Sequence, residues 1–65
     1  MCLSSVYLTE KTPENRVMED ASMVAESNGT VTVSSLFGDK KAFEGYDLSE
    51  VNLLEHYVVL KKKEK

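Results

Sequence analysis

The most reactive side chain of this sequence is the cysteine at position 2, which is also its only cysteine. A free cysteine inside a chain is commonly buried as a small apolar residue, but position 2 places the thiol beside the chain's own amine. If Met1 is retained, its amine, the Cys2 amide nitrogen and the Cys2 sulfur can close two fused chelate rings on one metal ion. Planar nitrogen and thiolate donors suit Ni(II) or Cu(II), whereas zinc prefers a tetrahedral set. If Met1 is removed, the amine and sulfur of Cys2 still form a chelating pair.

Other potential metal ligands are few. His56 is the only histidine, and it has two interpretations: a neutral or partly exposed residue at a strand corner, or an outer ligand contributed to a metal. Glu19, Asp20 and Glu50 lack the loop spacing of a calcium site and are expected to be solvated acids. A structural zinc site usually takes four cysteine and histidine ligands, which one chain of this composition cannot provide. Two chains together could supply more of these ligands.

The sequence contains no recognisable set of catalytic residues. Nucleophilic catalysis needs a nucleophile, a base and an orienting group, and one cysteine with one histidine offers no informative spacing for them. Gly29, Gly38 and Gly45 stand singly, so no glycine-rich phosphate loop is present. The tyrosines lack the interleaved arginines of a base-stacking surface. We therefore expect a binding protein and not an enzyme.

Charge is unevenly distributed along the chain. Residues 61–65 contain four lysines, whereas residues 1–60 carry four basic and ten acidic side chains, a balance of −6. An acidic surface repels phosphate backbones, so nucleic-acid binding is not expected. The lysine run is expected to be a solvated tail beyond the last apolar residue, Leu60, and to be dispensable for stability and metal binding.

The length of 65 residues leaves room for one domain with a modest core. Domains of this size usually need a disulfide, a metal or a second subunit, and a single cysteine excludes a disulfide within the chain. Self-association and metal binding remain, and a homodimer is expected. Neither a run of about 18 apolar residues nor a signal peptide is recognised, so we expect a cytoplasmic protein without a membrane span.

The elements that would position these residues are predicted to be short strands. β-branched and aromatic residues favour a strand over residues 5–10. Pro13 lacks an amide donor and places a polar loop at residues 11–15. Residues 17–26 are compatible with either a strand or one face of a helix, and we favour the strand.

A β-hairpin is the clearest local signal. Asn28 and Gly29 stand between two apolar runs, which predicts a tight turn. In the second arm, Val31 and Val33 should face the core. The hydroxyl residues of the same arm should face the solvent, namely Thr30, Thr32 and Ser34.

The last third of the chain has two interpretations. Helical spacing of apolar residues makes a helix within residues 46–60 an alternative, but Tyr-Val-Val at residues 57–59 favours a strand, with a hairpin corner at residues 53–56. Gly38 and Gly45 mark bends on either side of a further short strand.

The predicted fold class is mostly β. Five or six short antiparallel strands with a turn about every ten residues suggest a small closed or nearly closed barrel, because closure removes exposed sheet edges. Residues 1–60 are expected to form this single β-barrel domain, and residues 61–65 the lysine-rich tail.

Several short segments follow one another in an informative order. They are Met1-Cys2, Val6-Tyr7-Leu8, Met18-Glu19-Asp20, Leu36-Phe37-Gly38, Leu53-Leu54-Glu55-His56 and Val58-Val59-Leu60. In this joint order, over essentially its whole length, the chain resembles the CooT family of small nickel-binding accessory proteins. Each segment alone is a weak signal, and the order of all of them within so short a chain is more specific.

The resemblance implies a fold, an assembly and a function. The fold would be a small SH3-like or Sm-like β-barrel, forming a homodimer that holds Ni(II) at the subunit interface through Cys2. The function would be nickel delivery or storage for carbon monoxide dehydrogenase, a client enzyme that the residues themselves do not reveal. The alternative function is an RNA-binding or protein-interaction module that uses the barrel surface.

Overall fold

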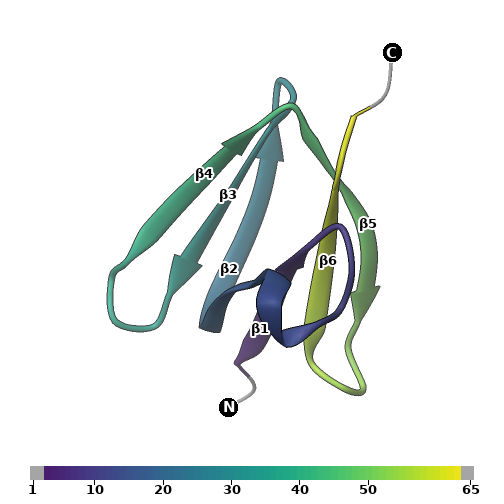
Figure 1. Cartoon of the computed structure of the whole chain (residues 1–65). Coiled ribbons are helices and arrows are strands. Elements are labelled where there is room, and N and C mark those ends of the chain that lie inside the picture. Colours follow the sequence, from purple (N-terminus) through teal and green to yellow (C-terminus); the bar gives the residue numbers. More distant parts are fainter. Residues whose placement is uncertain (1–2, 64–65) are drawn as a thin grey trace.

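Six β-strands make up most of residues 3–63, the part of the chain that the computed structural model describes (Figure 1). The elements are β1 (Ser4–Leu8), the 3-10 turn η1 (Pro13–Asn15), β2 (Arg16–Ser27), β3 (Thr30–Ser35), β4 (Lys40–Glu44), β5 (Tyr46–Asn52) and β6 (Tyr57–Lys62). Residues 17–26 and 46–52 are strands, so the mostly β prediction is confirmed and the helical alternatives are wrong. No helix in this part of the chain has the length and apolar character needed to cross a membrane.

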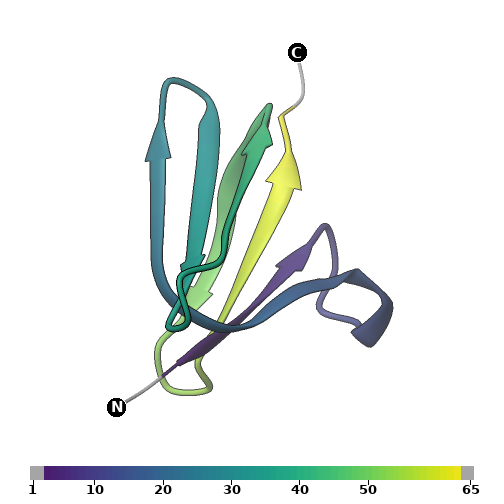
Figure 2. The ribbon, with the colours of Figure 1, turned by 90° about the vertical axis from the view of Figure 1, so that its left-hand side faces the viewer.

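The strands form one sheet in the order β4-β3-β2-β1-β6-β5. The sheet curls, so that the β2 and β3 hairpin lies across from β6 and β5 (Figures 1 and 2), and β3 contacts β5. Neighbouring strands are antiparallel except β1 and β6, which run parallel. The expectation of antiparallel strands throughout is therefore wrong for this pair. A parallel pair needs a long crossover, and here all the strands between β1 and β6 supply it.

Gly45 is the corner at which the two edges of the sheet meet. β4 and β5 are these edges, and they do not pair with each other, so the sheet is barrel-like but not closed. The Gly45 N–H donates to the Gly29 carbonyl at 2.8 Å, and the Gly45 carbonyl accepts from the Lys63 N–H at 2.7 Å. Its φ of 79° is readily adopted by glycine. Gly45 therefore passes the chain from the β3 and β4 ladder to the β5 and β6 ladder.

The hairpin between β2 and β3 has the predicted turn. Asn28 and Gly29 have φ values of 53° and 81°, and positive φ at both central residues defines a type I′ turn. Val31 and Val33 are fully buried, so the predicted inward face is confirmed.

Ser34 departs from the predicted alternation, because it is buried rather than solvent-facing. The register of β2 shifts opposite this part of β3, between Ala21 and Met23. A strand bends at such a bulge, and the alternation of inward and outward residues is lost there. Within the described residues, the Ser34 hydroxyl has no hydrogen-bond partner.

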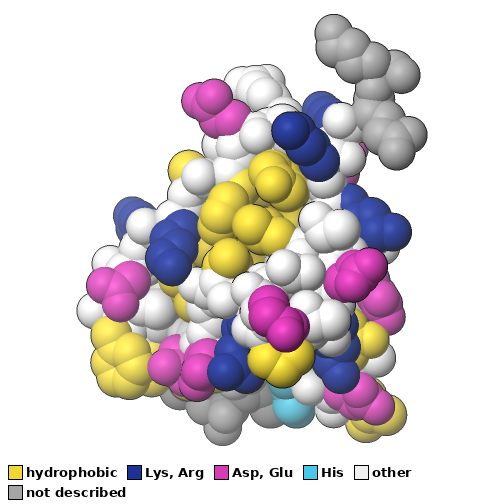
Figure 3. Space-filling view, in the orientation of Figure 1, with side chains coloured by type: hydrophobic (Ala, Val, Ile, Leu, Met, Phe, Trp, Pro, Cys, Tyr) yellow, Lys and Arg dark blue, Asp and Glu magenta, His cyan; other side chains and the backbone are white. Residues whose placement is uncertain are grey.

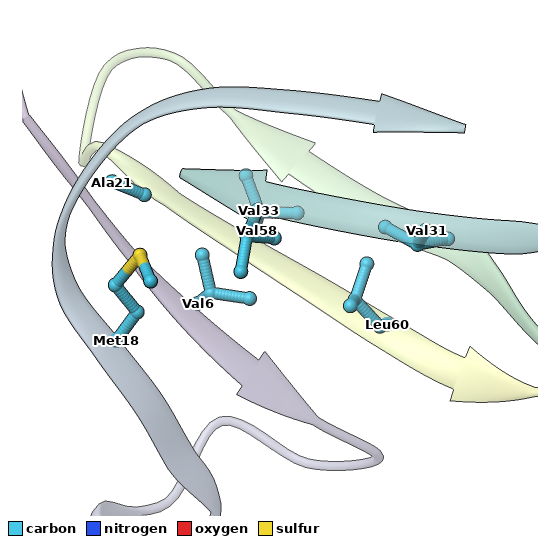
Figure 4. Packing of buried hydrophobic residues seen from close by; sticks show 7 residues of the cluster. All are labelled: Val6, Met18, Ala21, Val31, Val33, Val58 and Leu60. Atoms are coloured by element: carbon cyan, nitrogen blue, oxygen red, sulfur yellow. The ribbon is translucent and has the colours of Figure 1, made fainter. Parts of the chain in front are cut away.

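The core lies inside the curl of the sheet and is made by β1, β2, β3 and β6 (Figure 4). Its buried residues are Val6, Met18, Ala21, Val31, Val33, Val58 and Leu60. Full burial of a Val or Leu side chain contributes about 1.5 to 3 kcal/mol. The centre of this small core therefore accounts for much of the stability of the chain.

The C-terminal lysines are held more tightly than predicted. β6 continues to Lys62, with Lys61 opposite Asp47 and Lys62 opposite Tyr46, and the Lys63 N–H bonds to Gly45. The side chains of Lys61, Lys62 and Lys63 are exposed, as expected, but β6 extends past the boundary predicted at Leu60. Strand pairing is made by backbone hydrogen bonds, so residues with solvated side chains can continue a strand.

Removal of residues 61–65 should therefore destabilise the fold. The truncation deletes backbone hydrogen bonds to β5 and Gly45, each contributing about 0.5 to 1.5 kcal/mol, so we expect a loss of roughly 1 to 3 kcal/mol in urea denaturation. Replacing Lys61, Lys62 and Lys63 with Gln keeps the backbone and should cost much less. Equal stability of the truncated and full chains would contradict this prediction.

Candidate functional site

The predicted ligands Met1 and Cys2 lie outside the described residues, but the strand that follows them is well defined. Ser4, two residues after Cys2, already pairs with Ala21 of β2. On the other side, the Ser5 N–H donates to the His56 carbonyl at 3.1 Å. β1 is thus held between β2 and β6 from its first residues, and the fully buried Val6 anchors it to the core.

His56 lies in the turn between β5 and β6, at the same end of the molecule as the start of β1 (Figures 1 and 2). It is partly exposed and has a φ of 61°, an uncommon value outside turns. The Glu55 N–H donates to Asn52 Oδ1 at 2.7 Å and stabilises the turn. The strand-corner interpretation of His56 is confirmed, and its role as an outer metal ligand stays a prediction.

Acidic residues do not combine with His56 into a metal site. Within residues 3–63, no three side chains of the ligand types lie close enough together to hold a metal ion. Glu19 forms an ion pair with Arg16 at 3.0 Å, and Glu50 accepts a hydrogen bond from Tyr57. A metal site built from one copy of these described residues is therefore not available.

Tyr57 is the centre of a polar and aromatic cluster on β6. Its hydroxyl donates to Glu50 Oε2 at 2.7 Å, and the Tyr7 ring meets it edge-on with centroids 6.4 Å apart. Lys11 Nζ lies 4.7 Å from the ring centroid, a cation–π distance. The hydrogen bond to Glu50 raises the pKa of Tyr57 above its ordinary 10.0, because ionisation would remove the proton that Glu50 accepts. Tyr57 is therefore a neutral donor at physiological pH.

This cluster was not predicted from the sequence. Tyr57 and Glu50 are seven residues apart, and only the hairpin between them brings them together. The contact could have been recognised by placing residues 46–52 beside 57–62 in a hairpin. Tyr57 lies opposite Asn52 there, which makes Glu50 its diagonal neighbour within reach of a long side chain. The cluster ties the loop after β1 to β6.

A surface pocket of about 430 Å³ lies between β2 and the β3–β4 loop. It is lined by Val17, Met18, Glu19, Asp20, Ser35, Phe37, Asp39, Lys40 and Lys41. The Ser35 hydroxyl accepts the N–H groups of Phe37 and Asp39 at 3.1 and 3.0 Å, which fixes the loop. Three acids and two lysines line the pocket, so it presents no single sign of charge to a ligand. This pocket was not predicted from the sequence either.

The face seen in Figure 3 has a mixed character. Acidic and basic side chains are interspersed there around a central apolar area (Figure 3). A phosphate backbone is recognised by a continuous basic patch. The coloured part of this face offers interspersed charges instead.

Comparison with known proteins places the chain among accessory proteins, which serve an enzyme and are not themselves catalysts. The family model for "CO dehydrogenase accessory protein CooT" matches residues 1–61. The chain belongs to the CooT family, as the resemblance predicted, and so to the CO dehydrogenase system.

The fold agrees with a solved structure of the same description. The crystal structure of a protein assigned as CooT from Carboxydothermus hydrogenoformans superposes with a TM-score of 0.80, covering 97% of this chain and 100% of that one. The two sequences are 16% identical, so this similarity establishes the fold. No curated protein matches the chain.

Proposed function

We propose that this chain binds Ni(II) for delivery to, or storage for, CO dehydrogenase, and that two copies hold one Ni(II) between their Cys2 thiolates. The observation that carries the proposal is the family match, which begins at residue 1 and therefore includes Cys2. The only cysteine of the chain stands next to the chain amine within that matched region.

The donor chemistry supports two chains rather than one. A single thiolate is a poor site, whereas a two-fold axis beside Cys2 presents two thiolates without adding a ligand to the sequence. The Met1 amine and the Cys2 amide nitrogen would complete a planar set, which suits Ni(II) by geometry. Cu(II) is the stronger competitor by the general affinity order, and Zn(II) is disfavoured by geometry.

The pairing of β1 gives the proposed ligand a fixed attachment point. β1 is paired on both sides from Ser4 and Ser5 onward, so a ligand two residues earlier starts from a fixed strand. Nickel is the cargo here. Because the ligand is the thiolate, binding should release protons and should weaken below the pKa of the thiol.

Titration of untagged protein with nickel tests this proposal. Calorimetry should give one Ni(II) per two chains, with a thiolate-to-nickel absorption band that reaches its plateau at the same ratio. Protein with residues added before Met1 is the control, and it should bind less tightly because the Met1 amine has become an amide. One Ni(II) per chain, or equal binding by the extended protein, would contradict the proposed ligand set.

A further inference from the structure

Four large apolar side chains are exposed along β5 and the turn that follows it. They are Leu48 at 45%, Val51 at 51%, Leu53 at 79% and Leu54 at 88% exposure. Leu48 lies opposite the buried Leu60, and directly opposite residues of paired strands point to the same face. Val51 lies opposite the buried Val58 in the same way. The apolar layer of the core therefore continues to β5 and ends there without a neighbour among the described residues.

β5 also has one side of its backbone available for strand pairing. Within residues 3–63 it pairs only with β6. The other edge strand, β4, carries an inward lysine, because Lys41 lies opposite the buried Val33 and its Nζ donates to the Val17 carbonyl at 2.8 Å. Inward charges on an edge strand hinder the addition of another strand. β5 has Leu48 and Val51 on its inward face instead, so it is the edge that can accept a strand.

A second copy of this chain does not fit the β5 edge when two copies share one metal through Cys2. β5 ends where β1 begins, because Asn52 pairs with Tyr57 and Tyr57 pairs with Ser5. Two β5 strands paired about a two-fold axis would run antiparallel, and the two β1 starts would lie at opposite ends of that dimer. The β5 edge is therefore left for a different protein.

The charges of β5 and its turn favour a basic partner. They comprise Asp47, Glu50 and Glu55, with neither lysine nor arginine. Asp47 is balanced by β6, because it lies opposite Lys61 and 3.8 Å from Lys63 Nζ. Glu50 and Glu55 form no ion pair within the described residues. The unbalanced negative charge therefore lies toward the end of β5 and in its turn.

We propose that the outer edge of β5 binds an extended segment of the enzyme that receives the nickel, as an added strand of the sheet. The backbone of such a strand supplies affinity, and its alternate side chains supply specificity. Its apolar residues cover Leu48 and Val51, and its basic residues lie beside the acids toward the end of β5. This inference rests on the proposed function and names the surface that the client enzyme contacts.

The turn after β5 lies where a client enzyme would have to receive metal. Leu53 and Leu54 are in this turn, at the same end of the molecule as the start of β1 (Figures 1 and 2). The Glu55 N–H donates to Asn52 Oδ1 at 2.7 Å and stabilises the turn. A segment that binds along β5 and contacts these leucines holds the client at the end where β1 begins. One added strand is a small interface, as is typical of transient complexes.

Binding to nickel-free CO dehydrogenase from the same organism tests the surface. Val51→Lys places a charge on the inward face of the edge, and Leu54→Lys does so at a turn position whose exposure makes it safe for folding. Ala42→Lys, at an exposed position of β4, is the matched control. Calorimetric titration should give equal affinities for the parent and the control, and at least about a tenfold weaker affinity for both test variants.

Removal of one acid tests the preference for a basic segment. Glu55→Gln keeps the backbone N–H that Asn52 accepts, and it should weaken client binding and reduce its dependence on salt concentration. Asp39→Asn removes the same charge in the β3–β4 loop and should leave client binding unchanged. Equal affinity of the Glu55→Gln protein and the parent would overturn the assignment of a basic segment.

The outcomes separate this inference from the proposed function. One Ni(II) per two chains should be measured for all these variants, because none of the changed residues is a proposed ligand. If the folded Val51→Lys and Leu54→Lys proteins bind CO dehydrogenase as tightly as the parent, or if the parent does not bind it, the β5 surface is overturned and the nickel stoichiometry can still be measured. Protection of β5 amides from hydrogen exchange on addition of CO dehydrogenase would support strand addition directly.

Discussion

Replacement of Cys2 by Ser should abolish tight nickel binding while leaving the fold and the dimer intact. Serine keeps the size of the side chain but is protonated at neutral pH, so the thiolate donors of both copies are lost together. We expect the affinity to fall by at least about a hundredfold, which corresponds to about 2.7 kcal/mol. Calorimetry and the loss of the thiolate-to-nickel absorption band measure this effect.

His56→Asn provides the matched comparison for the Cys2 variant. Asparagine tolerates the positive φ that this turn position requires, so the backbone bond to Ser5 should persist. Its nickel affinity should fall much less than that of Cys2→Ser. Undiminished nickel binding by the Cys2→Ser protein would overturn the proposed site. A larger loss of nickel affinity in His56→Asn than in Cys2→Ser would identify His56, and not Cys2, as the principal ligand.

Leu60→Ala should unfold most of the protein. Leu60 is fully buried at the centre of the core, and truncation of such a leucine costs about 2 to 5 kcal/mol. A single core of this size supplies only about 3 to 5 kcal/mol. Urea denaturation followed by circular dichroism, at one fixed protein concentration, should show a large fall in the midpoint or no folded baseline.

Phe37→Ala is the control for this loss of stability. Phe37 is also large and apolar, but it is 74% exposed, so its truncation creates no cavity. Its midpoint should stay close to that of the parent. Comparable stability of Leu60→Ala and Phe37→Ala would show that the core does not depend on Leu60.

The local elements of the fold were predictable from the sequence. The Asn28-Gly29 turn and the inward-facing Val31 and Val33 follow from turn chemistry and alternation, and both are confirmed. These signals depend only on residues close in the chain. Residues 17–26 needed the structure, because their pattern fits both helix and strand.

The long-range features were not predictable in the same way. The parallel pairing of β1 with β6 joins residues from the two ends of the chain, and no local pattern records it. The extension of β6 past Leu60 depends on backbone partners at Tyr46 and Asp47. Burial of Ser34 follows from a register shift in the neighbouring strand, which single-strand alternation does not contain.

The candidate site likewise has a part that is local in the sequence and a part that depends on contacts between strands. Cys2 could be recognised as a candidate ligand because its position beside the chain amine is a local feature of the sequence. Its placement lies outside the described residues. The cluster of Tyr57, Glu50 and Lys11 and the pocket beside β2 depend on contacts between strands. The proposed ligand was therefore predictable from the sequence, whereas the Tyr57 cluster and the pocket were not.

The parallel pairing of β1 and β6 also sets the order in which the molecule can be assembled during synthesis. β1 is made first, but its partner residues Tyr57 to Leu60 are made almost last. Contacts of such large sequence separation form slowly, because a long loop must close before they contribute. The strand next to Cys2 therefore gains its second neighbour only when nearly all of the chain has left the ribosome.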